Sequence, residues 1–227
     1  MMQKRFFLLK GRPFVFLSAT GHGTKGAKEE AALAFDRLNR ELKKLGGSID
    51  DVVRITVFTK NQECRPAVSD VRNEVFPHAT RPSSSSIIVH DFSPGDTVIE
   101  VDATAFLSKG KKYHKKGFEF DPPRAYIKAI EVEDILFISG QTGRGENIEA
   151  QTASACSSID NIMTELGSSW KNVLQVSCYI KRLELFDIVH RMIQEKIANK
   201  LIPIDLALAD EYAQPGVLIE IEVAVAK

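Results

Sequence analysis

The stretch SIDDVVRITVFTK, residues 48–60, decides the fold because a similar stretch, SWKNVLQVSCYIK, follows 121 residues later at residues 169–181. Both begin with serine, run through β-branched and aromatic residues, and end in lysine. Similarity repeated at one spacing is the signature of a duplicated structural unit. Four further matches keep this spacing to within one residue: Ser18 with Ser139, Leu45-Gly46 with Leu166-Gly167, Pro82 with Pro203, and Ile99-Glu100-Val101 with Ile219-Glu220-Ile221.

The repeat predicts two modules, residues 1–107 and 121–227, joined by residues 108–120. Each module has the element order ββαβαββ. The first helix of the first module shows apolar residues at steps of three and four, up to Leu45, and ends at Gly46-Gly47. Short runs rich in β-branched and aromatic residues predict the strands. The predicted strands and second helices lie at 5–9, 14–18, 52–59, 67–76 (helix), 84–90 and 97–106, and then at 125–130, 135–139, 173–180, 186–198 (helix), 205–208 and 217–226.

The expected fold class is α/β (α+β), with one mixed sheet and two helices on one of its faces in each module. Strands joined by a helix favour a parallel pair with a right-handed crossover. We expect the opening and closing strand pairs to be antiparallel hairpins, the closing pairs turning at residues 93–96 and 214–216.

Lysine makes up five of the ten residues 108–117, between the two copies. Such a run predicts either a nucleic-acid or phosphate contact or a solvated linker. Charge, glycine and the position at the repeat boundary favour the linker, so we do not expect a nucleic-acid partner.

The composition indicates which partners and which cellular location to expect. Lys+Arg and Asp+Glu both number 30, so the net charge of zero gives no pull toward nucleic acid or an anionic membrane. The apolar start of the chain resembles a signal peptide but is interrupted at residues 10–13. No stretch approaches the roughly 20 apolar residues of a membrane helix. The three cysteines have no metal-type spacing, which predicts a cytoplasmic protein with reduced thiols.

Several motifs of the second copy carry a family resemblance. The run ISGQTG, residues 138–143, resembles the "SGQ" strand end of the RidA/YjgF family of small imine and enamine deaminases. YIKAI at residues 126–130, Pro203 and the closing IEIEVA at residues 219–224 follow the family's order. The first copy resembles the family through the repeat, with the weaker LSAT at residues 17–20 in place of "SGQ".

This resemblance implies a chorismate-mutase-like module, three of which close a ring with ligand clefts between neighbours. It also implies hydrolysis of small enamines, imines or 2-aminomuconate-like acids to ketoacids and ammonia, without a metal or organic cofactor. The expected partners are a small-molecule substrate and further copies of the chain, as a homotrimer.

The resemblance assigns catalytic roles to Glu220, Ser139 and Tyr126. A glutamate can take a proton from water and return it to the leaving nitrogen if burial raises its pKa. Glu100 is the counterpart of Glu220 in the first copy. The alternative interpretation of Glu220 is a polar residue on the solvent side of a half-buried strand.

Substrate contacts are expected from Gly140, Gln141, Arg144, Glu100 and His190, the last in place of a family asparagine. The family's deaminases also carry an arginine two residues after a proline, which holds the substrate carboxylate. Here Ser84 and Asp205 occupy the two corresponding positions. Arg144, Arg182 and Arg191 are the expected substitutes.

Three hypotheses about function follow. The first is a hydrolytic deaminase that uses Glu220. The second is a ligand-binding or regulatory protein that keeps the cleft and has lost the chemistry, which the missing arginine favours. The third is a different hydrolysis on the same scaffold.

Overall fold

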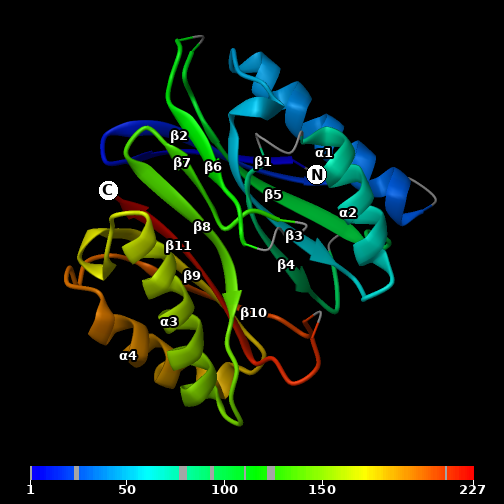
Figure 1. Ribbon diagram of the computed structural model, residues 1–227. Coiled ribbons are helices and arrows are strands. Elements are labelled where there is room, and N and C mark those ends of the chain that lie inside the picture. Colours follow the sequence, from blue (N-terminus) through cyan, green and yellow to red (C-terminus); the bar gives the residue numbers. More distant parts are fainter. Residues whose placement is uncertain are drawn as a thin grey trace.

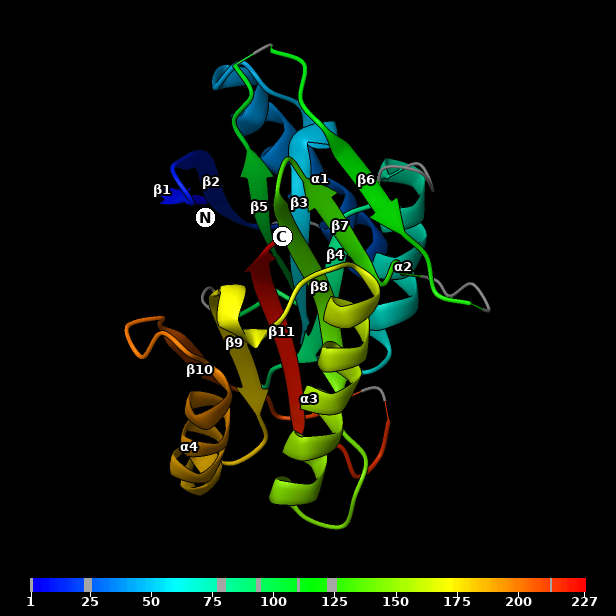
Figure 2. The same cartoon turned by 60° about the vertical axis from the view of Figure 1, so that its left-hand side comes forward.

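The computed structural model describes residues 2–22, 26–76, 81–92, 95–109, 111–121, 126–212 and 214–227. The chain forms two mixed sheets, each covered on its outer face by two helices (Figure 1). The helices of the two modules lie on opposite sides of the paired sheets in both views, so the inner faces of the sheets meet (Figure 2). This confirms the predicted fold of two repeated α+β modules with helices on one face of each sheet.

The first module has the sheet order β1-β2-β5-β3-β4. β1 and β2 are antiparallel, and β3 and β4, joined by α2, are parallel. Its elements are β1 (Met2–Leu9), β2 (Arg12–Thr20), α1 (Ala27–Lys44), β3 (Val52–Thr59), α2 (Cys64–Val75), β4 (Ser83–Ile88) and β5 (Ile99–Phe106).

The second module has the sheet order β10-β9-β11-β8-β7-β6. Its elements are β6 (Lys115–Phe118), β7 (Ala129–Val132), β8 (Ile135–Thr142), α3 (Ile148–Glu165), β9 (Val173–Ile180), α4 (Phe186–Lys196), β10 (Ile204–Leu208) and β11 (Ile219–Ala226). Its opening pair, β7 and β8, is antiparallel, and β9 and β10 are parallel, as predicted.

The closing strands are not in hairpins, so that prediction is wrong. β5 lies between β2 and β3, and β11 lies between β8 and β9. Every residue of β11 is buried, and a strand buried along its whole length needs neighbours on both edges. The central position satisfies that need, whereas a hairpin with β10 would leave β11 at an edge. Of the two expected turns, Ser93 and Pro94 lie outside the described residues.

The lysine-rich segment contains structure that the sequence did not indicate. β6 lies within residues 108–120 and pairs antiparallel with β7. The Nζ of Lys115 donates to the carbonyl oxygens of Asp50 and Val52, at 2.9 Å for Val52. Burial lowers the pKa of Lys115 to about 8. Tyr113 donates its hydroxyl to Asp51 at 2.7 Å. These contacts fasten the segment to the first module.

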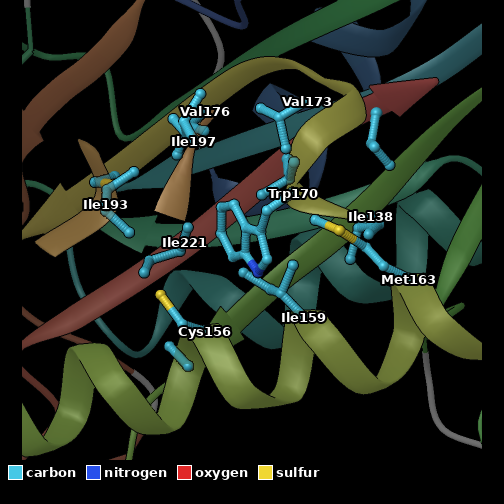
Figure 3. Close-up of a cluster of buried hydrophobic side chains, with 14 of the residues drawn as sticks. Ile138, Cys156, Ile159, Met163, Trp170, Val173, Val176, Ile193, Ile197 and Ile221 are labelled. Carbon is cyan, nitrogen blue, oxygen red and sulfur yellow. The ribbon is translucent and has the colours of Figure 1, made fainter. Parts of the chain in front are cut away.

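Alternation along β11 decides what each face of the second sheet contacts. Ile219, Ile221 and Val223 pack with α3 and α4 in the core of the module, where Trp170 lies among Cys156 and Ile159 (Figure 3). Because side chains alternate between the faces of a strand, Glu220 and Glu222 point the other way, toward the first module.

Aromatic contacts join the inner faces of the sheets. The ring of Phe137 on β8 lies edge-on to Phe14 on β2, with 5.5 Å between centroids. The guanidinium of Arg54 on β3 lies 5.2 Å from the Phe137 ring centroid. Backbone hydrogen bonds add to this junction, since Asp210 N donates to Ile88 O at 2.9 Å. No helix among the described residues is long and apolar enough to cross a membrane.

Phe137→Ala tests whether the two modules stabilise each other. Phe137 is 1% exposed, so we expect its truncation to lower the free energy of unfolding by about 3–5 kcal/mol, as for other buried phenylalanines. Phe6→Ala is the control, because Phe6 is 56% exposed and its loss should change stability by less than about 0.5 kcal/mol. Urea unfolding followed by circular dichroism measures both; equal stability of the two variants would contradict a packed junction.

Candidate active site between the modules

A cavity of about 320 Å³ lies between the modules. Its wall in the first module comes from β3, α2 and β4. Its wall in the second module comes from β8, β11, the loop before β11, and Tyr126, which precedes β7. Neither copy therefore contains the site alone. The polar residues that line the cavity are Arg65, Ser69, Arg72, Ser84, Ser85, Ser86, Tyr126, Thr142, Tyr212, Gln214 and Glu220.

Glu220 is the buried carboxyl group of this cleft. It is 7% exposed, and burial raises its pKa to about 7. The Ser85 hydroxyl lowers the pKa, nearby Glu222 raises it, and Arg65 and the Ser86 backbone lower it. A carboxyl group that titrates near neutral pH can both donate and accept a proton under physiological conditions.

Gly140 makes room for that carboxyl group. A Cβ atom at position 140 would lie 1.9 Å from Oε1 of Glu220 and 2.4 Å from Oγ of Ser85. Any side chain there would displace one of these groups. Glycine in the "SGQ" run therefore lets the Glu220 carboxyl lie against the backbone of β8.

Glu222 anchors the polar face of β11 to the first module. Its Oε2 accepts from Ser85 Oγ at 2.8 Å, and its Oε1 accepts from Tyr179 Oη at 3.1 Å. The Nη1 of Arg54 lies 4.0 Å from Oε1. The two glutamates thus face a protein interface, and the solvent-facing interpretation of this strand does not hold.

Two arginines of α2 line the cleft, and sequence reasoning missed both. The Nη1 of Arg72 donates to Ser84 Oγ at 3.1 Å. Ser84 is the second residue after Pro82, so the guanidinium of Arg72 lies beside the position where the resemblance implies an arginine. Arg65 lies two helical turns earlier and donates from Nη1 to Gln62 Oε1 at 3.3 Å. Their seven-residue spacing, on a helix whose other face is apolar, was the available signal.

Of the predicted catalytic residues, Glu220 and Tyr126 meet in this cleft and Ser139 does not line it. The hydroxyl of Ser139 accepts from Ser84 N at 3.0 Å and donates to Ile127 O at 2.7 Å. Both bonds are buried, so this side chain joins the modules. The Tyr126 ring packs edge-on against Phe120, with 5.3 Å between centroids.

The other predicted substrate contacts are dispersed. Gln141 donates from Nε2 to the carbonyl oxygens of Ser139 and Gly140 and lies outside the cavity lining. Arg144 is exposed beside a neighbouring hollow. His190 is exposed on α4. His190 and Arg144 lie away from the cleft because the helix that lines it is α2 of the first module. The corresponding helix of the second module, α4, packs on the outer face of its own sheet. Arg182 and Arg191 are likewise exposed and do not line the cleft.

Glu100 lines a separate hollow of about 500 Å³, whose lining residues all come from the first module. Its Oε1 accepts from Ser18 Oγ at 3.1 Å. Burial raises the pKa of neighbouring Asp102 to about 7. The hollow is lined by β2 and β5, the first module's counterparts of β8 and β11. Unlike the Glu220 cleft, it has no lining residue on a helix in the described part of the chain. Among the described residues, no three His, Cys, Asp or Glu side chains are grouped so that they could hold a metal ion.

The raised pKa of Glu220 predicts how stability depends on pH. The folded protein holds the proton up to about pH 7, whereas the unfolded chain releases it near 4.5, so ionisation costs stability as pH rises between these values. Replacing Glu220 by glutamine removes that cost, which is about 3 kcal/mol once Glu220 is fully ionised. We expect the free energy of unfolding of Glu220→Gln to rise relative to the unmodified protein between pH 5 and pH 8. If the difference in the free energy of unfolding between the two proteins stayed constant from pH 5 to pH 8, the raised pKa of Glu220 would be contradicted. Asp102 titrates in both proteins, so its contribution cancels in this difference.

Comparisons with known proteins agree with this arrangement. The family model described as Endoribonuclease L-PSP matches twice, at residues 17–107 and 118–227. AldR, named as a candidate regulator in Lactococcus lactis subsp. lactis (strain IL1403), is 32% identical in an alignment of 114 residues that covers 45% of this chain and 90% of AldR.

A solved structure shares the fold over nearly the whole chain. A chorismatase superposes with a TM-score of 0.69 at 17% identity, over 98% of this chain and 79% of that one. A YjgF/YER057c/UK114-family protein of Mycobacterium tuberculosis matches half of this chain and all of its own length, with a TM-score of 0.46 and 19% identity. On the double match of the family model and the identity to AldR, the chain belongs to the endoribonuclease L-PSP family, also called YjgF/RidA.

Proposed function

We propose that the chain is a hydrolytic deaminase of small enamine or imine acids, acting in the cleft between its two modules. The observation that carries this proposal is Glu220, a buried carboxyl group with a pKa near 7 in a cavity that also holds two arginines. Family membership supports the reaction class, and the position of Arg72 beside Ser84 removes the main objection to it.

The chemistry needs one group that moves protons and one that holds the acid. Protonated Glu220 donates to the enamine carbon, which gives an iminium ion. Ionised Glu220 then takes a proton from the attacking water, which gives a carbinolamine, and passes this proton to the nitrogen. As the carbon–nitrogen bond breaks, the hydroxyl group of the carbinolamine returns its proton to Glu220, so that a ketoacid and ammonia are released and Glu220 is protonated again. Arg72 holds the substrate carboxylate through its planar fork of donors. Tyr126 and the hydroxyl groups of residues 84–86 orient the water and the nitrogen.

Glu220→Gln tests the enzymatic proposal. Glutamine keeps the size of the side chain but cannot exchange the proton, so we expect ammonia release from 2-aminoacrylate, generated in situ from serine, to fall by at least about 100-fold. Arg72→Gln should mainly raise KM, because it removes a contact made in the ground state as well as the transition state. Glu100→Gln is the matched control and should retain activity. Equal rates for Glu220→Gln and Glu100→Gln would refute the role of Glu220.

A second candidate function is ligand binding without turnover, as in a regulator. The identity to AldR, a candidate regulator, favours it. The two functions differ in one measurement: a regulator would bind a small acid in this cleft and release no ammonia from any enamine tested.

Assembly and location belong to this proposal. We propose a homotrimer, as the family resemblance implies, and a cytoplasmic location, which the free cysteines Cys64, Cys156 and Cys178 favour. The substrate is a small molecule, and no nucleic-acid partner is proposed.

A further inference from the structure

A groove of about 580 Å³ lies between the inner faces of the two sheets, and we call it the inner groove. Strands β1, β2, β3 and β5 form its wall in the first module, and β9, β10 and β11 form its wall in the second. Among the described residues, none that lines the inner groove also lines the Glu220 cleft. The inner groove is therefore a separate hollow, built like the cleft from both modules.

Arg54 is a buried cation of the inner groove with unused hydrogen-bonding capacity. The residue is 5% exposed, and its guanidinium lies over the Phe137 ring. Its Nη1 is 4.0 Å from Glu222 Oε1, which is too far for a hydrogen bond. Its Nε and Nη2 are buried and have no hydrogen-bond partner among the described residues. Because buried donors without acceptors cost free energy, an acceptor that enters the groove is favoured once the guanidinium turns toward it.

Asp102 supplies the opposite charge beside Arg54. It is paired with Thr56 across β5 and β3, and Arg54 precedes Thr56 by two residues. The side chains of Arg54 and Asp102 therefore leave the sheet on the same face, about 7 Å apart at Cβ. Oδ1 of Asp102 is buried and has no hydrogen-bond partner in the described part of the chain.

Glu222 is the other carboxyl group on the floor of the inner groove, and its oxygens are occupied. Oε2 accepts from Ser85 Oγ at 2.8 Å, and Oε1 accepts from Tyr179 Oη at 3.1 Å. Asp102 differs, because burial raises its pKa to about 7 and leaves Oδ1 without a donor. The floor thus offers one unsatisfied guanidinium and one unsatisfied carboxyl group to a ligand.

The walls of the inner groove are mainly apolar. They carry partly exposed aromatic and aliphatic side chains from three strands of the first module and one strand of the second: Phe7, Leu9, Phe16, Phe58 and Leu174. The remaining charged groups, Arg5 and Asp205, are exposed and of opposite sign. A wall of this kind beside one positive and one negative group complements a molecule with an apolar body and a zwitterionic head.

We infer that the inner groove is a second binding site, which takes a free amino acid with an aromatic side chain. The carboxylate of the amino acid pairs with Arg54, and its ammonium group pairs with Asp102. Its ring packs among Phe7, Phe16 and Phe58, since contacts between aromatic rings add to the gain from burial. A volume of about 580 Å³ lies within the range of small-molecule sites. The inference does not rest on the proposed deaminase, because the two sites share no residue.

L-phenylalanine and two analogues test the inference, because 3-phenylpropionate lacks the ammonium group and phenethylamine lacks the carboxylate. Isothermal titration calorimetry of the full-length protein at pH 8, where Asp102 is ionised, should give a Kd for L-phenylalanine at least about tenfold lower than for either analogue. Asp102→Asn should weaken L-phenylalanine to the level of 3-phenylpropionate and leave 3-phenylpropionate within about twofold. Asp91→Asn, which removes an exposed carboxylate outside the inner groove, is the matched control and should change none of the three.

Phe16→Ala keeps both charged groups and removes part of the apolar wall, so it should weaken all three ligands by a similar factor. Glu220→Gln should leave the affinity for L-phenylalanine within about twofold. A loss of L-phenylalanine binding in Glu220→Gln but not in Asp102→Asn would place the ligand in the other cleft and overturn the inference. Equal affinity of the unmodified protein for L-phenylalanine and both analogues would also overturn it. So would the absence of binding, which is the result expected if a second copy of the chain fills the groove.

Discussion

The structure depends on the burial of two glutamates from one strand in the junction between the modules. Carboxyl groups removed from water need hydrogen-bond partners, and here the other module supplies one of them. Glu222 receives them from Ser85 of the first module and Tyr179 of its own. This requirement fixes how β11 lies against β4. The same arrangement places Glu220 at the end of the junction where a cavity opens, and burial there raises its pKa into the neutral range.

Much of the fold could be predicted from the repeat. Spacing and hydrophobic periodicity are local properties, and they placed the helices and strands within a few residues. The order of strands in the sheet is not local. The closing strands, such as β11, insert between two strands that are not their neighbours in sequence. Burial of both faces of β11 is the reason for this central position. In the sequence, however, β11 is only a run of apolar residues with two glutamates. β6 was missed because lysine and glycine dominate its segment, while its pairing depends on β7 and its anchoring on Lys115.

The part of the candidate site that comes from the second module could be predicted, and the part that the first module contributes could not. Glu220, Gly140 and Tyr126 lie in the cleft, and each was named from a motif of the second copy. Ser139 came from the same motif, yet its hydroxyl is occupied by backbone groups. Arg65 and Arg72 could not be placed from sequence, because periodicity shows that a helix has a polar face but not which neighbour that face meets.

The mixed origin of the cleft frees each copy to evolve separately. In a ring of identical subunits, a substitution on the cleft helix appears in every cleft and must suit all of them. Here the counterpart of Arg72 at the repeat spacing is Ile193, which is fully buried in the core of the second module. One duplicated position has become a charged group at a cavity, and the other a packing residue. Gene fusion has thereby broken a symmetry that would have forbidden both choices at once.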